Sequence, residues 1–116
     1  MSDRLLRINE AVRAVLGEAI GSLSDPRLGF VTITGVKIAR DLRAGQVFYS
    51  VLGDDEQRVR TQAALDSARA VLQREMAREV KMHHTPQLTF VYDDTTDTAL
   101  RIASLLDDVR TEDEPR

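Results

Sequence analysis

The sequence predicts a single α+β domain in which helices cover one face of a three-stranded sheet. Three observations point to this class. An apolar stripe at helical spacing opens the chain, two runs rich in β-branched residues follow it, and a long helical region precedes a third such run. With 116 residues, the chain has room for one modest core. We expect the domain to span residues 1–109.

The first helix is predicted from apolar residues that recur three or four positions apart. They are Leu5, Ile8, Val12, Val15, Ala19 and Leu23. Asp3 precedes this stripe and is a suitable N-cap. The helix should end by about Ser24, because the residue before a proline, here Asp25, avoids helical backbone angles.

The next two elements are predicted to be strands. Residues 30–39 are rich in β-branched side chains, and their apolar positions change parity at Gly35, so we expect a β-bulge there. Residues 47–52 form the second predicted strand. The short polar connector over residues 41–45 should join the two strands as a hairpin.

A helical pattern then runs from residue 56 to residue 82, with Asp54 or Asp55 available as its cap. The stretch is about twice as long as an average helix. The segment Ser67–Ala70 lies near its middle. A serine there can bond back to a carbonyl one turn earlier and bend the helix, and small side chains allow close approach. The pattern therefore predicts two helices that meet at a kink.

The last predicted strand opens at Pro86, because a proline is tolerated at the start of a strand. Alternating apolar residues from Leu88 to Tyr92 support it. Residues 93–106 combine acidic capping residues with apolar positions and predict a final helix. Residues 110–116 carry too few apolar groups to order themselves, so we expect an acidic, disordered tail. The side chains expected to be largely buried are Leu5, Ile8, Val12, Leu72, Met76, Leu88 and Phe90.

The composition narrows the classes of function. The chain has no Cys, which excludes disulfides and cysteine-ligated zinc sites and fits a reducing cytoplasm. The N-terminus lacks the apolar run of a secretory signal, and no stretch approaches the ~18 apolar residues of a membrane span. We expect a cytoplasmic protein that does not contact membranes.

The net charge of −3 is unevenly distributed. Five acidic and two basic residues lie between Asp107 and Arg116, which leaves 14 of each sign in residues 1–106. An acidic tail thus follows a neutral body. Long-range attraction of nucleic acid is weak for such a chain, so any phosphate contact must come from a local basic patch.

Two motifs carry the most specific signal. The segment Asp25-Pro26-Arg27-Leu28-Gly29-Phe30-Val31-Thr32-Ile33-Thr34 joins the first helix to the first strand, and Thr85-Pro86-Gln87-Leu88-Thr89-Phe90-Val91-Tyr92-Asp93 covers the third strand. Asp41-Leu42 and Val51-Leu52-Gly53 lie between them. Together these motifs resemble the ribosome-binding factor A family of bacteria, from about Arg4 to Leu106. The order of elements is also that of type II KH domains.

The resemblance implies a KH-like (type II) fold in which a helix–kink–helix with an Ala-x-Gly signature replaces the GXXG loop of other KH domains. The matching positions are Ala68, Arg69 and Ala70, so the final glycine is an alanine in this chain. This departure removes a permissive backbone site at which a phosphate approaches most closely. The general KH pattern is that such a crossing clamps the sugar-phosphate backbone.

The resemblance also implies a function. Members of this family are non-enzymatic ribosome assembly factors, which bind the immature small ribosomal subunit and its rRNA during late maturation and processing, and the family is associated with cold adaptation. We expect a monomer without a cofactor. The chain has no nucleotide-binding motif, so an energy-dependent release would require a separate assembly GTPase acting on the same particle.

The leading RNA-binding candidates are the basic residues of the second predicted helix pair, Arg69, Arg74, Arg78 and Lys81. Arg74 and Arg78 are one turn apart and share a face, which Lys81 extends. The functional interpretation is a stripe that contacts rRNA phosphates. The alternative is a solvated face in which Glu75 pairs with Arg78.

Other basic residues and the first motif are weaker candidates. Arg4 and Arg7 begin the first helix, and Arg40 and Arg43 flank the hairpin connector, where they could reach backbone phosphates. For the remaining motif residues an architectural role is favoured. Asp25 can accept hydrogen bonds from backbone amides across Pro26. Arg27 can pair with Asp25 or contact RNA. The structural motif residues are Asp25, Pro26, Arg27, Ser67, Ala68 and Ala70.

Metal binding and catalysis find little support. His83 and His84 are adjacent and so point in different directions, and no third ligand follows at a known spacing. Asp93, Asp94 and Asp97 lack the EF-hand pattern and are better explained as helix caps. No Cys–His pair, glycine-rich phosphate loop or nucleophile elbow is present. Two other hypotheses stay open, a KH-like module for other single-stranded RNA and a KH-like adaptor domain whose sheet binds a protein partner.

Overall fold

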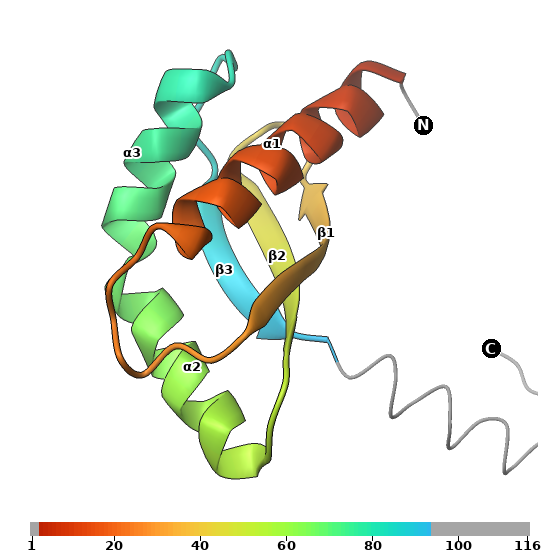
Figure 1. Cartoon of the computed structure of the whole chain (residues 1–116). Coiled ribbons are helices and arrows are strands. Elements are labelled where there is room, and N and C mark those ends of the chain that lie inside the picture. Colours follow the sequence, from red (N-terminus) through yellow and green to blue (C-terminus); the bar gives the residue numbers. More distant parts are fainter. Residues whose placement is uncertain (1–2, 94–116) are drawn as a thin grey trace, which may run out of the picture.

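The computed structural model describes residues 3–93 of the chain. Six elements follow one another in these residues: α1 (Asp3–Gly21), β1 (Val31–Ile38), β2 (Ala44–Val51), α2 (Asp55–Ser67), α3 (Arg69–Glu79) and β3 (Gln87–Tyr92) (Figure 1). This order confirms the predicted α+β class. The expected final helix over residues 93–106 and the acidic tail lie almost entirely outside the described residues.

The three strands form one mixed sheet in the order β1-β2-β3. β1 and β2 pair antiparallel, which confirms the predicted hairpin, and β3 lies parallel to β2. A parallel neighbour requires a crossover connection, which α2 and α3 supply. The three helices gather on one side of the sheet (Figure 1), with α1 packed on β1 and α3. The opposite face carries no helix among the described residues.

The bulge predicted at Gly35 is present. Ile33 pairs with Tyr49, but the next paired residue on β1 is Gly35, which lies opposite Phe48. Thr34 is therefore the extra residue of β1. Because this insertion reverses the alternation of side chains, Ile33 and Ile38 are both buried although their positions differ in parity.

The strand pair also needs a glycine at Gly45. A Cβ atom at this position would lie 2.6 Å from Cδ1 of Ile38, the residue paired with it on β1. Such a separation is well below van der Waals contact, so a side chain at Gly45 would displace Ile38 from the core.

The core lies between the helices and the inner face of the sheet. Its most buried members include Val12, Leu16, Val47, Tyr49, Leu65, Leu72, Met76, Leu88 and Phe90. The predicted burial of Val12, Leu72, Met76, Leu88 and Phe90 is confirmed. For Leu5 and Ile8 the prediction overstates burial, because these two residues are only half-buried near the open start of α1.

The kink predicted within the long helical region is also present. α2 begins after Asp54, whose Oδ1 accepts a hydrogen bond from the amide of Gln57 at 2.9 Å. It ends at Ser67, and α3 begins at Arg69. The helical pattern was expected to reach residue 82, but α3 ends at Glu79 because Val80 takes an extended conformation and is buried.

Candidate nucleic-acid interface

The turn that follows α1 is organised by Asp25. Its Oδ1 accepts hydrogen bonds from the backbone amide of Arg27 at 2.9 Å and from Arg27 Nε at 3.0 Å, and Oδ2 accepts from Nη2 at 2.7 Å. The amide of Leu28 donates to the Asp25 carbonyl at 3.0 Å and closes the turn across Pro26. These bonds hold Arg27 against Asp25 and leave little freedom to either side chain.

The same bonds change the titration of Asp25. Hydrogen bonds from the Arg27 side chain, and then from its backbone amide, lower the pKa of the Asp25 carboxyl from 3.8 to about 2. The carboxylate in turn raises the pKa of Arg27. Both groups are therefore charged throughout the neutral range.

This turn is tied to the kink between α2 and α3. Arg27 Nη2 donates to Ser67 Oγ at 3.2 Å, and Gln57 Nε2 donates to the Arg27 carbonyl at 3.0 Å. Arg60 Nη2 lies at 3.5 Å from the carbonyl oxygen of Pro26. The turn and the kink, which sequence reasoning treated as separate motifs, thus form one structural unit.

Ala68 is the residue at which the helical pair bends. It has φ −89° and ψ 1°, and its amide donates to the carbonyls of Ala64 and Leu65. Its own carbonyl accepts from the amide of Leu72 at 2.9 Å, the first bond of α3. Among residues 3–93 no side chain caps the start of α3, so amide groups of its first turn are available as donors beside the exposed Ala70.

The basic residues predicted to contact RNA do not all lie together. Arg69 turns back onto α2, where its Nη2 pairs with Asp66 Oδ1 at 3.2 Å. Arg74 and Arg78 lie on the opposite side of α3 by helical geometry, and both are exposed. Lys81 is exposed beyond the end of the helix. We call Arg74, Arg78 and Lys81 the α3 basic face.

Part of this face has acidic partners. Arg78 pairs with Glu75 and lies 3.8 Å from a carboxylate oxygen of Glu79. Arg74 and Lys81 make no ion pair within residues 3–93. The solvated alternative considered for this stripe therefore applies to Arg78, whereas Arg74 and Lys81 keep their charge unpaired within the described part of the chain.

A groove between α1 and α3 has the opposite character. It measures about 490 Å³, and Glu18, Glu75 and Glu79 line it together with apolar side chains such as Val15 and Val71. These carboxylates repel phosphate, so nucleic acid is not expected to enter this groove. The acidic groove sets one boundary of the α3 basic face.

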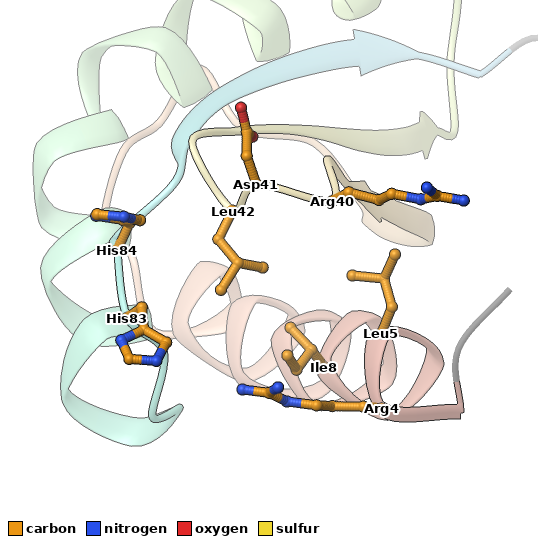
Figure 2. Close-up of a pocket in the computed structure, with 8 residues that line it drawn as sticks. All are labelled: Arg4, Leu5, Ile8, Arg40, Asp41, Leu42, His83 and His84. Carbon is orange, nitrogen blue, oxygen red and sulfur yellow. The ribbon is translucent and has the colours of Figure 1, made fainter.

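A second group of basic residues lies at the end of the fold where α1 begins and α3 ends. Arg4, Arg40, His83 and His84 line a pocket of about 460 Å³, which we call the N-terminal pocket (Figure 2). Arg4 comes from α1, Arg40 from the β1–β2 turn, and the two histidines from the connection between α3 and β3. Three segments distant in the sequence therefore place basic side chains around one hollow.

This arrangement separates the weaker candidates into two sets. Arg4 and Arg40 line the N-terminal pocket, whereas Arg7 and Arg43 are exposed outside it. The sequence places His83 and His84 at the end of the basic stripe, where they were weighed as metal ligands, but their place in this pocket was missed. Their position directly after the basic end of α3 was the available signal.

Neither a metal centre nor a membrane-spanning helix is found in the described part of the chain. Within residues 3–93, no group of three or more His, Cys, Asp or Glu residues is placed to hold a metal ion. In the same part of the chain, no helix combines the length and hydropathy needed to cross a bilayer. Asp93, once considered as a cap or cation ligand, accepts a hydrogen bond from Thr34 Oγ1 at 2.6 Å.

Comparison with known proteins points to one family. A family model described as Ribosome-binding factor A matches residues 4–106. A ribosome-binding factor A from Geobacter sulfurreducens is 39% identical over 97% of this chain and 96% of its own length. One from Streptomyces griseus is 43% identical over 95% of this chain and 70% of its own length.

Solved structures agree with the sequence comparison. The crystal structure of ribosome-binding factor A from Thermus thermophilus superimposes with a TM-score of 0.68 at 27% identity, covering 76% of this chain and 94% of that one. A homology model of the same factor, fitted into a cryo-electron-microscopy map of its 30S complex, gives a TM-score of 0.61 at 28% identity, covering 73% and 90% of the two chains.

Proposed function

This chain belongs to the ribosome-binding factor A family, and from that membership we propose that it is a non-enzymatic factor that binds the immature small ribosomal subunit and its rRNA during late maturation. The observation that carries the proposal is the structural likeness to a relative fitted into a map of a 30S complex. That likeness covers 73% of this chain and 90% of that one.

The surface proposed to contact rRNA is formed by the kink and by the α3 basic face. The uncapped start of α3 offers amide donors to a phosphate, and Arg74 and Lys81 offer charge that no carboxylate within residues 3–93 neutralises. Contacts of this kind position a nucleic acid without reading its sequence. They suit a factor whose target is set by the shape of a ribosomal particle.

The link between Arg27 and Ser67 supports this use of the kink. A phosphate contact is specific only if the donors stay in place, and the hydrogen bonds of the turn fix one side of the kink. On this proposal the Asp25–Arg27 motif contributes indirectly, because it holds the backbone that binds RNA. Assembly GTPases that act on the same particle would supply any energy-dependent release.

Co-sedimentation tests the proposal. Full-length protein should sediment with immature small subunits from a cold-grown culture and only weakly with mature 70S ribosomes. Equal sedimentation with both, or with neither, would overturn it. We also expect a tagged chain to localise to the cytoplasm. Depletion of the chain should cause rRNA precursors to accumulate.

The adaptor hypothesis has one supporting observation. The sheet face opposite the helices exposes mainly neutral residues, such as Thr32, Gln46 and Thr89, with Lys37 as the single charged side chain on it in β1 to β3. This face would suit a protein partner better than RNA. Small-subunit binding that is lost in a Gln46→Glu, Thr89→Glu variant but unaffected by salt would favour it.

A further inference from the structure

The floor of the N-terminal pocket is apolar, although basic side chains surround it. Leu42 points from the β1–β2 turn towards the space into which Leu5 and Ile8 project from α1 (Figure 2). Leu5 and Ile8 are half-buried, so their outer surfaces remain open to a ligand. The volume of about 460 Å³ lies within the range of roughly 300–1,000 Å³ that is usual for sites of small organic groups.

Positive charge lies on two sides of this floor. The guanidinium of Arg4 extends towards His83, whereas Arg40 leads away on the opposite side (Figure 2). Among the described residues that line the pocket, Asp41 alone carries a carboxylate, and its side chain points away from the floor in the same view. Its Oδ1 accepts a hydrogen bond from the backbone amide of Arg43 at 3.0 Å, so Asp41 serves the turn.

The backbone at Leu42 is in the left-handed region, with φ 62°. This conformation disfavours a branched apolar residue by about 1 kcal/mol and is usually taken by glycine or asparagine. Here it directs a leucine side chain, 9% exposed, onto the floor of the pocket. The turn therefore keeps a leucine at a position where glycine or asparagine would adopt the backbone conformation more easily.

The pocket also continues the α3 basic face. α3 rises towards the end of the fold at which α1 begins (Figure 1), and Lys81, His83 and His84 follow directly after it. The kink lies at the other end of α3, about 16 Å away by the rise of an 11-residue helix. A strand bound along α3 would reach this pocket several nucleotides beyond the kink.

We propose that the N-terminal pocket holds one unpaired ribonucleotide of the bound RNA, with its base on the floor of Leu5, Ile8 and Leu42 and its flanking phosphates against Arg4 and Arg40. The inference rests on the proposed function for the source of the RNA. A flat base with a phosphate on either side matches the apolar floor and the two flanking arginines of the pocket. The imidazoles of His83 and His84 supply aromatic faces of the kind on which unstacked bases lie.

The test uses NMR amide spectra of the full-length protein. Pentaadenylate and pentauridylate should shift the signals of Ile8, Leu42 and His83. Inorganic phosphate alone should shift none of the floor residues, because it lacks a base. Leu42→Asn should weaken pentanucleotide binding about fivefold, because it replaces apolar surface beneath the base with a polar amide. Leu52→Asn makes the same change at a leucine that is 75% exposed elsewhere, and should leave affinity unchanged.

Several outcomes overturn the proposal. Pentanucleotides that shift only signals of α3 and the kink, or that bind the folded Leu42→Asn variant as tightly as the wild type, exclude a base in the pocket. If Leu42→Asn does not fold, the Arg4→Ala, Arg40→Ala variant serves in its place, because it changes only exposed side chains. In this variant pentanucleotides should no longer shift the signals of Ile8, Leu42 and His83. Wild-type protein that fails to co-sediment with small subunits, yet takes pentanucleotides into the pocket, overturns the proposed function and not the pocket.

Discussion

The side chains of Arg27 and Ser67, 40 residues apart in the chain, are joined by a hydrogen bond in which Arg27 Nη2 donates to Ser67 Oγ at 3.2 Å. The same guanidinium pairs with Asp25 at 2.7 Å. The residue that ends α2 is therefore held by the turn that leads into β1. A substitution in this turn should therefore alter the position of the kink, even though the turn lies outside the α3 basic face.

Arg27→Ala should lower the free energy of unfolding, because it removes the bonds to Asp25 and Ser67 from a partly exposed site. Urea denaturation measures this change. Arg13→Ala is a suitable control, since it removes only an exposed pair with Glu10 and should lower the free energy of unfolding less. Equal losses in the two variants would show that the link to Ser67 contributes nothing.

The stability contributed by Asp25 should depend on pH. Its pKa is lowered from 3.8 to about 2 in the folded protein, so the ionised carboxylate stabilises the fold above pH 4, and this stabilisation disappears as the pH falls through about 2. Asp25→Asn cannot ionise. The stability difference between wild type and this variant should therefore be greatest above pH 4 and shrink towards pH 2, as followed by urea unfolding. A difference that stays constant over this range contradicts the assigned pKa.

Reversing the charge of the α3 basic face should weaken binding to small subunits. In the Arg74→Glu, Arg78→Glu, Lys81→Glu variant we expect at least a tenfold loss, with a salt dependence reduced by roughly 0.7 in log–log slope for each lost contact to single-stranded RNA. The free energy of unfolding should change by less than about 1 kcal/mol, because all three side chains are exposed. Sedimentation at several salt concentrations gives both quantities.

The matched control for this variant carries the same change of charge elsewhere, as Arg13→Glu, Lys37→Glu, Arg58→Glu. It should bind nearly as well as the wild type, because these residues lie off the proposed surface. A folded α3 variant with undiminished binding would move the search to Arg4, Arg7, Arg40 and Arg43.

Ala70→Gly should separate the stability of α3 from its binding. Glycine in a helix is disfavoured by about 1 kcal/mol relative to alanine, and Ala70 is exposed in the first turn, so thermal stability should fall slightly. Binding to small subunits should stay within about twofold, because the kink already forms with alanine. A large gain in affinity would mean that the alanine keeps phosphate away from the backbone.

Deleting residues 110–116 should not weaken binding to small subunits. The segment carries three acids and two bases, and removing it makes the chain slightly less negative. At low salt the deletion should therefore raise affinity a little, and at high salt it should have no effect. Loss of binding on deletion would assign the tail a direct contact.

Much of the local structure could be predicted from residue patterns. The change of parity around Gly35 identified the bulge, and the small residues after Ser67 identified the kink, because each is a local interruption of a regular pattern. The end of α3 was placed too late. Val80 continues the apolar helical period, yet its burial is achieved in an extended conformation at the start of the connection to β3. Periodicity cannot distinguish these two ways of burying one side chain.

The sequence alone determined the order of elements, the hairpin, the bulge, the kink and the family resemblance, since each depends on residues that are close in the chain. Only the tertiary structure decided that β3 lies parallel to β2, where Gln73 Oε1 accepts from the Leu88 amide at 2.8 Å. It also brought Arg4, Arg40 and His83 around one pocket and joined Arg27 to Ser67. These contacts depend on how the helices pack on the sheet, and packing brings together residues whose separation in the chain carries no periodic signal.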